Sequence, residues 1–268
     1  MKDLACTLTI AGTDPTGGAG IQADLKTFQE LKTYGMSVIT SVLAQNTTGV
    51  QEVFHQPLSL IEKQIDSVIS DIPVHAFKTG MIANLEMMAL LEQKIPEINA
   101  PYVMDPVMVA TSGDSLIDAN AREFLRDRLM PFAHIVTPNI PEAESLFGDN
   151  IASIDDMKEA AYQIVRNFKA KAALVKGGHL HDDAIDILYD GEKMHSFTSK
   201  RIDTNNTHGT GCTLSAAITS YLAKGLPLYE AVDKSKTYIT TAIQHALDIG
   251  KGNGPTNHWA PRIEEARS

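Results

Sequence analysis

The sequence has few cysteines and no long apolar run. Its 268 residues contain two cysteines, Cys6 and Cys212, too few for a disulfide framework and typical of a reducing compartment. Charged residues or glycine interrupt every apolar stretch before the ~18 residues that a membrane helix needs. At the N-terminus, Asp3 lies where a signal peptide would need apolar residues. We therefore expect a cytoplasmic protein without membrane spans.

Several binding motifs are also missing. The formal net charge is −10, from 23 basic and 33 acidic residues, and no basic run is interleaved with aromatic residues, so we expect no nucleic-acid partner. The nine histidines form neither an HExxH pair nor a Cys/His cluster, which disfavours a zinc site. No GxxxxGK[ST] or GxGxxG occurs, which excludes a Walker P-loop and disfavours a Rossmann dehydrogenase. A phosphate ligand stays possible, because helix N-termini and backbone N–H groups act locally.

What the sequence does contain is an alternation of short β-branched runs with stretches of helical periodicity. This rhythm predicts parallel βαβ units, and 43% hydrophobic composition allows one large core. We expect strands at 6–10, 37–43, 76–79, 102–104, 135–137 and 174–176, and helices at 153–168, 212–224 and 229–246, with a further helix behind a Ser59/Glu62 capping box. Residues 186–189 and 194–198 flank an Asp-Gly turn and predict an antiparallel hairpin. The prediction is one doubly wound α/β domain over residues 1–268.

Ligands of such sheets bind at the carboxyl ends of the strands, where a glycine-rich turn leads into a helix. The residues are Asn206–Thr213, with Gly209, Gly211 and Cys212. The glycines leave backbone N–H groups uncovered, which predicts an anion hole for a transferring phosphoryl group. The helix N-terminus is expected to lower the pKa of Cys212 and make it reactive, although a lone cysteine is often a small buried apolar residue.

Other polar residues follow predicted strands. Asn139 and Glu142 form a capping-box pattern that local structure could explain; the functional alternative places Asn139 near nucleotide phosphates and Glu142 near Mg²⁺ through water. Asp105 offers a carboxylate at the same edge and could otherwise be a turn former. Lys176 precedes two glycines and could bind phosphate; the alternative is a solvated lysine at a strand end.

Taken together, the motifs resemble one family. GTDPTGGAGIQADLKTFQE, AQNTTGVQ, KTGM, DPVM, TPNIPEAE, VKGGH, NNTHGTGCTLSAAI and GKGNGP occur in this order from Gly12 to Pro255. They resemble the hydroxymethylpyrimidine and phosphomethylpyrimidine kinases of thiamine synthesis. The resemblance implies a ribokinase-like sheet flanked by helices, ATP with Mg²⁺, and a homodimer. It implies two successive phosphorylations at one site, of 4-amino-5-hydroxymethyl-2-methylpyrimidine and then of its monophosphate.

The resemblance also implies roles for single residues. It assigns catalysis to Cys212, Gly209 and Gly211, ATP binding to Asn139, Lys176, Thr207 and Gly211, the metal to Asp105 and Glu142, and the pyrimidine to Gln45, Asp24, Gly12, Met81 and Val107. For Gln45 there is a physical rationale, since a carboxamide can pair with an exocyclic amine and the adjacent ring nitrogen. Met81 and Val107 would form apolar walls for the ring, and as isolated residues would be assigned to the core.

Two departures and two alternatives accompany this prediction. Thr111 stands where many relatives have lysine, which removes one cation expected near the phosphates, and Pro15 stiffens the first glycine-rich turn. A pyridoxal kinase of the same branch is the nearest alternative, but its usual members lack the AQNT run and the GKGNGP tail. A non-catalytic vitamin sensor is the alternative of another class; it would not need an intact anion hole.

Overall fold

The computed structural model describes residues 4–108, 119–178 and 183–265. Within these residues nine strands form one sheet, in the order β3-β2-β1-β4-β5-β6-β7-β8-β9. The strands are β1 (Cys6–Gly12), β2 (Tyr34–Asn46), β3 (Gly49–His55), β4 (Ala76–Thr79), β5 (Tyr102–Met104), β6 (Ile135–Val136), β7 (Ala173–Lys176), β8 (Ala184–Tyr189) and β9 (Met194–Ser199). The six neighbouring strands β2, β1, β4, β5, β6 and β7 are parallel to one another. At one edge β3 pairs antiparallel with β2, and at the other edge β8 and then β9 are added antiparallel.

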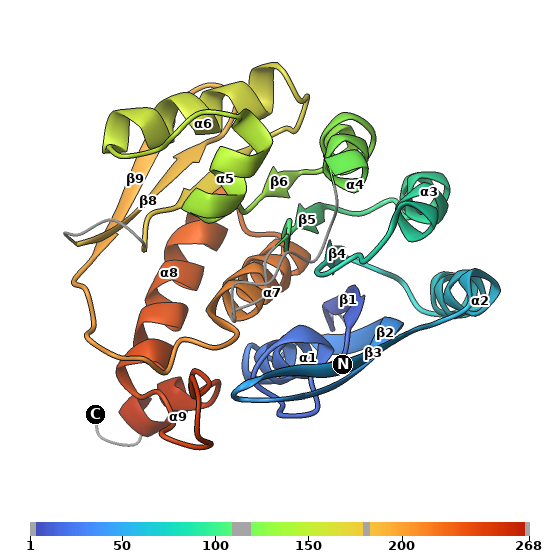
Figure 1. Ribbon diagram of the computed structural model, residues 1–268, viewed down its shortest axis with the longest axis horizontal. Helices are drawn as coiled ribbons and strands as arrows, with labels where there is room; N and C mark the ends of the chain where they lie inside the picture. The colour runs from blue at the N-terminus through green and yellow to red at the C-terminus, as the bar shows by residue number, and fades with distance from the viewer. Residues whose placement is uncertain (1–3, 109–118, 179–182, 266–268) are drawn as a thin grey trace.

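Helices cover both faces of this sheet (Figure 1). They are α1 (Gly20–Glu30), α2 (Leu58–Ile69), α3 (Leu85–Lys94), α4 (Ala119–Phe124), α5 (Ile140–Phe147), α6 (Ile154–Arg166), α7 (Thr210–Ala223), α8 (Leu228–Gln244) and α9 (Ala260–Glu265). Successive strand residues point to opposite faces, so Tyr102 and Met104 join the core under α2 to α6, while Val103 joins the core under α7 and α8. The fully buried pattern of β1 and β4 is typical of a parallel sheet covered on both sides.

The prediction of a mostly parallel α/β sheet with an antiparallel hairpin is confirmed. Each predicted strand is present, and β8 and β9 form the hairpin. The capping box at Ser59 was wrong: α2 begins one residue earlier, at Leu58 behind Pro57, and has no side-chain cap. The amides of Leu60 and Ile61 bond instead to the Pro57 carbonyl, so Ser59 lies inside the first turn, where its hydroxyl cannot act as the N-cap.

The arrangement brings one helix end to one sheet edge. α7 packs on the central strands β1, β4 and β5, with α1 and α8 on either side. Its N-terminus therefore lies at the carboxyl ends of the parallel strands, where the polar motifs were predicted to gather. Among the helices that the structure describes, none combines the length and apolarity needed to cross a bilayer.

Candidate active site

The N-terminal turn of α7 requires glycine at Gly209 and has little space for a side chain at Gly211. Gly209 is the N-cap, with φ +78°, and a Cβ there would lie 1.7 Å from the Gly18 carbonyl oxygen. At Gly211 a Cβ would lie 3.2 Å from Nζ of Lys176. Gly209 therefore permits the close approach of the Gly18 backbone, and Gly211 that of the Lys176 ammonium group. The first-turn N–H groups of a 14-residue helix provide partial positive charge at this point.

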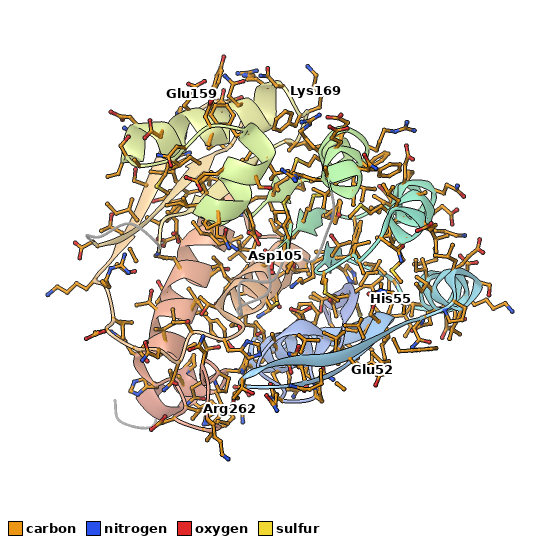
Figure 2. All side chains as sticks on the ribbon, viewed as in Figure 1. Glu52, His55, Asp105, Glu159, Lys169 and Arg262 are labelled. Carbon is orange, nitrogen blue, oxygen red and sulfur yellow. The ribbon has the colours of Figure 1, made fainter. Side chains whose placement is uncertain are left out.

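Lys176 and Asp105 form an ion pair beside that turn. Nζ of Lys176 lies 3.3 Å from Oδ1 of Asp105, and the two side chains are 13% and 1% exposed. Asp105 also accepts hydrogen bonds from Thr137 and Ser215, at 3.2 Å each. Burial acts to raise the pKa of Asp105, but the ammonium groups of Lys176 and Lys78 outweigh it and hold that pKa below its usual value. Asp105 lies at the centre of the molecule, next to α7 (Figure 2).

The alternative of a solvated Lys176 is wrong. The backbone N–H of Lys176 donates to the Pro138 carbonyl at 2.8 Å, and its side chain points under the α7 turn. Replacing it would leave Asp105 buried without its closest counter-charge, which is costly.

Asn139 and Glu142 form the predicted capping box at the start of α5. The Glu142 amide donates to Asn139 Oδ1, and the Asn139 amide donates to Glu142 Oε2, both at 2.8 Å. Burial raises the pKa of Glu142 to about 7, Lys176 opposes this rise, and the charge of Asp105 adds to it. Thus the local structural explanation of this motif holds, and it also places a second carboxylate within the electrostatic reach of Lys176.

Cys212 lies in the first turn of α7, partly buried. Burial raises the pKa of its thiol to about 12; Lys78 opposes the rise, and the carboxylates of Asp24 and Asp105 add to it. The prediction of a lowered thiol pKa was therefore wrong, because desolvation and two nearby negative charges outweigh the helix dipole. The backbone of Gly20, the first residue of α1, acts to lower the pKa of this thiol, but less strongly than burial raises it.

Gly12 and Met81 come together at the end of β1. A Cβ at Gly12 would lie 2.8 Å from Met81 Cε and 3.4 Å from Leu43 Cδ1, so these apolar groups converge at the end of β1. Gln45 is partly buried on the same face of β2 as Leu43. Val107, also partly buried, follows β5 two residues after Asp105.

Asp24 lies elsewhere than predicted. Its side chain is fully buried in an ion pair with Lys78 at 2.7 Å, and Thr9 donates to it at 2.6 Å. A carboxylate without exposed surface cannot contact a substrate directly, so its predicted role as a pyrimidine ligand is corrected. Lys78 Nζ also lies 3.4 Å from the Cys212 carbonyl, so the pair supports the α7 turn from below.

Sequence reasoning missed Lys78, Asp14 and His208. His208 Nε2 lies 2.7 Å from Oδ2 of Asp14, which also accepts the amide of Ala19 and so joins the two glycine-rich turns. The signal for Lys78 was a lysine inside β4, a short strand buried at every position. Thr207 is exposed at the rim of the α7 turn, and its carbonyl accepts from Thr210 Oγ1 at 2.6 Å. Thr111 lies outside the described residues.

The residues present suit magnesium better than a metal held by protein alone. In the described part of the chain no three His, Cys, Asp or Glu side chains come together as a metal cluster. Asp105 and Glu142 are two buried carboxylates whose charges both interact with Lys176. Mg²⁺ typically binds through one or two carboxylates, with water and substrate phosphates completing its coordination. The pair therefore fits an ion that arrives with a nucleotide.

Comparison with known proteins agrees with this geometry. The family model described as phosphomethylpyrimidine kinase matches residues 14–257. The chain belongs to the phosphomethylpyrimidine kinase family. A hydroxymethylpyrimidine/phosphomethylpyrimidine kinase from Staphylococcus aureus is 48% identical over 94% of this chain and 93% of its own length. A thiamine biosynthesis bifunctional protein from Geobacter sulfurreducens is 51% identical over 94% of this chain and 51% of its own.

Among solved structures, the ADP complex of Bacillus subtilis pyridoxal kinase is 41% identical, with a TM-score of 0.91; the match covers 97% of this chain and all of that one. Relatives that share this fold are therefore named for two different heteroaromatic substrates, hydroxymethylpyrimidine and pyridoxal. The predicted family and the predicted class of enzyme, a kinase, are both confirmed.

Proposed function

We propose that this kinase transfers the γ-phosphoryl group of ATP to 4-amino-5-hydroxymethyl-2-methylpyrimidine, and then a second phosphoryl group to the monophosphate, in thiamine biosynthesis. The observation that carries the proposal is the α7 turn at Gly209–Cys212. It places the first turn of α7 next to a buried cation, Lys176, and against the loop that follows the apolar end of β1 at Gly12 and Met81. One side suits phosphate, and the other suits a small flat ring.

The chemistry needs positioning and charge stabilisation more than covalent help, because the phosphoryl transition state is loose and negatively charged. We assign the amides of Gly209 and Gly211 to the transferring group, and Lys176, Asn139 and Thr207 to the nucleotide. Asp105 and Glu142 would hold Mg²⁺, which when bound would neutralise negative charge on the phosphates. The ion pair with Asp105 keeps the Lys176 ammonium at the helix turn before ATP binds.

For Cys212, we propose hydrogen bonding to the anion rather than base catalysis. A thiol whose pKa is about 12 holds its proton at neutral pH, so it can donate but cannot accept the hydroxyl proton of the substrate. A loose transition state has little need of that proton transfer early in the reaction. The Cys212 amide and thiol then belong to the same anion hole as the two glycines.

Gln45 supplies the recognition of the aminopyrimidine. Its amide can accept from the exocyclic amine and donate to the adjacent ring nitrogen, whereas a pyridoxal ring with a phenolic oxygen offers a different pattern. Met81 and Val107 would cover the two faces of the ring. A buried polar partner left unpaired costs about 1–3 kcal/mol, so such a site discriminates strongly between substrates.

The test compares two substrates and two proteins. We expect the kcat/KM of wild type to be higher for hydroxymethylpyrimidine than for pyridoxal. Gln45→Leu should lower kcat/KM for the pyrimidine by about 1–3 kcal/mol of transition-state free energy, and should affect pyridoxal less. The measurement is ADP release with each substrate at saturating ATP.

The second candidate function, pyridoxal phosphorylation, is favoured by the similarity to the B. subtilis pyridoxal kinase structure. A wild-type preference for pyridoxal, or equal losses with both substrates in Gln45→Leu, would replace the pyrimidine assignment by this one. If neither compound is phosphorylated, the non-catalytic sensor becomes the explanation for the retained sequence motifs.

A homodimer is part of the proposal. The outer face of the β2–β3 ribbon carries exposed apolar side chains, with Val42 and Phe54 directly paired across the two strands. Phe54 is 62% exposed. Apolar exposure on an edge ribbon is typical of a protein interface, and a second copy of this chain is the occupant that the family resemblance implies.

Two broader predictions stay open. We propose one kinase domain over residues 1–268, supported by a sheet that includes strands from Cys6 to Ser199. We also propose a cytoplasmic location, because Cys6 and Cys212 are both free, as expected in a reducing compartment.

A further inference from the structure

The GKGNGP motif belongs to a segment with no role in the mechanism above. Residues 249–258, here called the C-terminal strap, contact the turn between β2 and β3. The amides of Lys251 and Gly252 both donate to Oγ1 of Thr47, at 3.0 and 3.1 Å. These bonds join residues more than 200 positions apart in the chain, so they are a tertiary contact and not a local turn.

The same strap also holds the loop that leads into the anion hole. The Gly254 amide donates to Asn206 Oδ1 at 3.0 Å. The His208 amide donates to the Gly254 carbonyl at 3.1 Å, and the Thr256 amide returns a bond to the His208 carbonyl at 3.3 Å. His208 directly precedes Gly209, so the strap connects the β2–β3 turn with the phosphate-binding end of the site.

Close packing leaves no room for side chains at the contact with Thr47. A Cβ at Gly252 would lie 1.8 Å from the Thr47 carbonyl oxygen, and one at Gly250, where φ is +89°, would lie 2.4 Å from Thr47 Oγ1. Gly250 and Gly252 are therefore needed because they let the backbone of the strap pack directly against Thr47. This explains the spacing of GKGNGP without any ligand.

The far end of the strap is firmly anchored. Thr256, Asn257 and His258 are almost completely buried. His258 Nε2 lies 3.1 Å from Thr213 Oγ1 of α7, and the His258 carbonyl accepts from Tyr238 of α8 at 2.6 Å. Because this end is fixed to α7 and α8, the bonds to Thr47 attach the β2–β3 turn to the helix that carries the anion hole.

The β2–β3 ribbon needs such an attachment. β3 is the edge strand, and Asn46 pairs with Gly49, so Thr47 and Thr48 form the tip of a two-stranded ribbon. Two strands alone are marginally stable in water. Gln45 lies at the end of β2, two residues before Thr47, so a displacement of the tip displaces Gln45.

We propose that Thr47 is a positioning residue for substrate recognition: through its two bonds to the strap, it fixes Gln45 relative to the Gly209 turn. The distance between the ring-binding amide and the phosphoryl-binding turn is then set by the C-terminal strap. This inference rests on the proposed function, in which Gln45 binds the pyrimidine.

The central comparison is Thr47→Val against Thr47→Ser, since valine removes the acceptor at nearly constant shape and serine keeps it. Thr47→Val should raise KM for hydroxymethylpyrimidine about 5- to 10-fold, the effect of one or two lost hydrogen bonds. Its kcat and its KM for ATP should stay within about twofold of wild type, because the nucleotide side is untouched. Thr47→Ser should restore most of the pyrimidine affinity.

A second readout does not depend on activity. Amide hydrogen exchange at residues 249–254 should become faster in Thr47→Val, since two amides lose their acceptor. Lys251→Ala is the matched control, because Lys251 contributes only its backbone N–H. It should leave both KM and exchange unchanged, whereas Gly252→Ala should raise the pyrimidine KM at least as much as Thr47→Val.

Gln45→Leu, measured alongside, separates two kinds of failure. If Gln45→Leu lowers pyrimidine turnover but Thr47→Val has wild-type KM, the strap inference is wrong and the proposed function stands. If Gln45→Leu has no effect, the proposed recognition itself fails. A Thr47→Val protein that loses affinity for both substrates equally, together with a lowered Tm, would show a general structural role and overturn the positioning role.

Discussion

Two opposing effects act on the Cys212 thiol: the N-terminus of α7 favours its thiolate, and burial near Asp24 and Asp105 disfavours it. Because burial raises the pKa to about 12, we expect alkylation of Cys212 in the ligand-free protein to be slow at pH 7 and to accelerate up to at least pH 10. The thiolate, not the thiol, is the reactive species. Iodoacetamide labelling followed by mass spectrometry from pH 6.5 to 10 measures this.

The urea-unfolded protein provides the reference for that experiment, since its thiols titrate with an ordinary pKa near 8.5. If the alkylation rate of Cys212 levels off near neutral pH, the pKa of its thiol is lowered after all, and Cys212 could act as the catalytic base. Cys6 serves as an internal comparison, because burial raises the pKa of that thiol as well.

At the scale of elements, the junction of α7 with the C-terminal strap depends on a neutral histidine. Burial lowers the pKa of His258 to about 4, and the charge of Lys26 adds to this effect. An unfolded histidine titrates near 6.5, so between pH 6.5 and 4 the unfolded chain binds more protons. The contribution of neutral His258 to the free energy of unfolding should therefore be complete above pH 6.5. It should decrease as the pH falls to 4, by on the order of 3 kcal/mol.

Urea unfolding of wild type and His258→Gln, from pH 7.5 to 4.5, tests this expectation. Glutamine cannot be protonated, so the variant should lose less stability over the same range even if it is less stable at pH 7.5. Some slope should persist, because burial and Lys171 also lower the pKa of His134. If the free energy of unfolding falls with pH equally in the two proteins, His258 is not the source of the pH dependence.

At the scale of the whole molecule, the proposed dimer makes the β2–β3 ribbon an internal surface. Phe54→Lys should convert the dimer to a monomer, because a charge in an apolar interface is left without a partner when buried. Sedimentation velocity across a range of concentrations measures the change.

Phe132→Lys is a suitable control, as Phe132 is an exposed aromatic residue outside the ribbon and should leave the assembly unchanged. If wild type sediments as a monomer at micromolar concentration, the dimer proposal fails. If Phe54→Lys stays dimeric, another face forms the interface.

The sequence by itself determined the parallel sheet and the location of the chemistry. Short apolar strands between amphipathic helices can bury their residues in few other ways, and strand ends followed by glycine or polar residues indicate the functional edge. Asn139 with Glu142, and the turn at Gly209, are local patterns whose geometry depends on nearby residues. The sequence predicted them for that reason.

Only the tertiary structure decided how distant residues modify these patterns. β3 is exposed along nearly its whole length, so it lacks the apolar alternation that identifies a strand and forms by pairing with β2. Asp24 of α1 is charged and close to the substrate motifs, yet it is fully buried in an ion pair with Lys78 of β4. The pKa of Cys212 and the attachment of Thr47 to the strap likewise depend on groups brought together by folding. Electrostatic environment and long-range hydrogen bonds are properties of spatial proximity, which residue order alone does not specify.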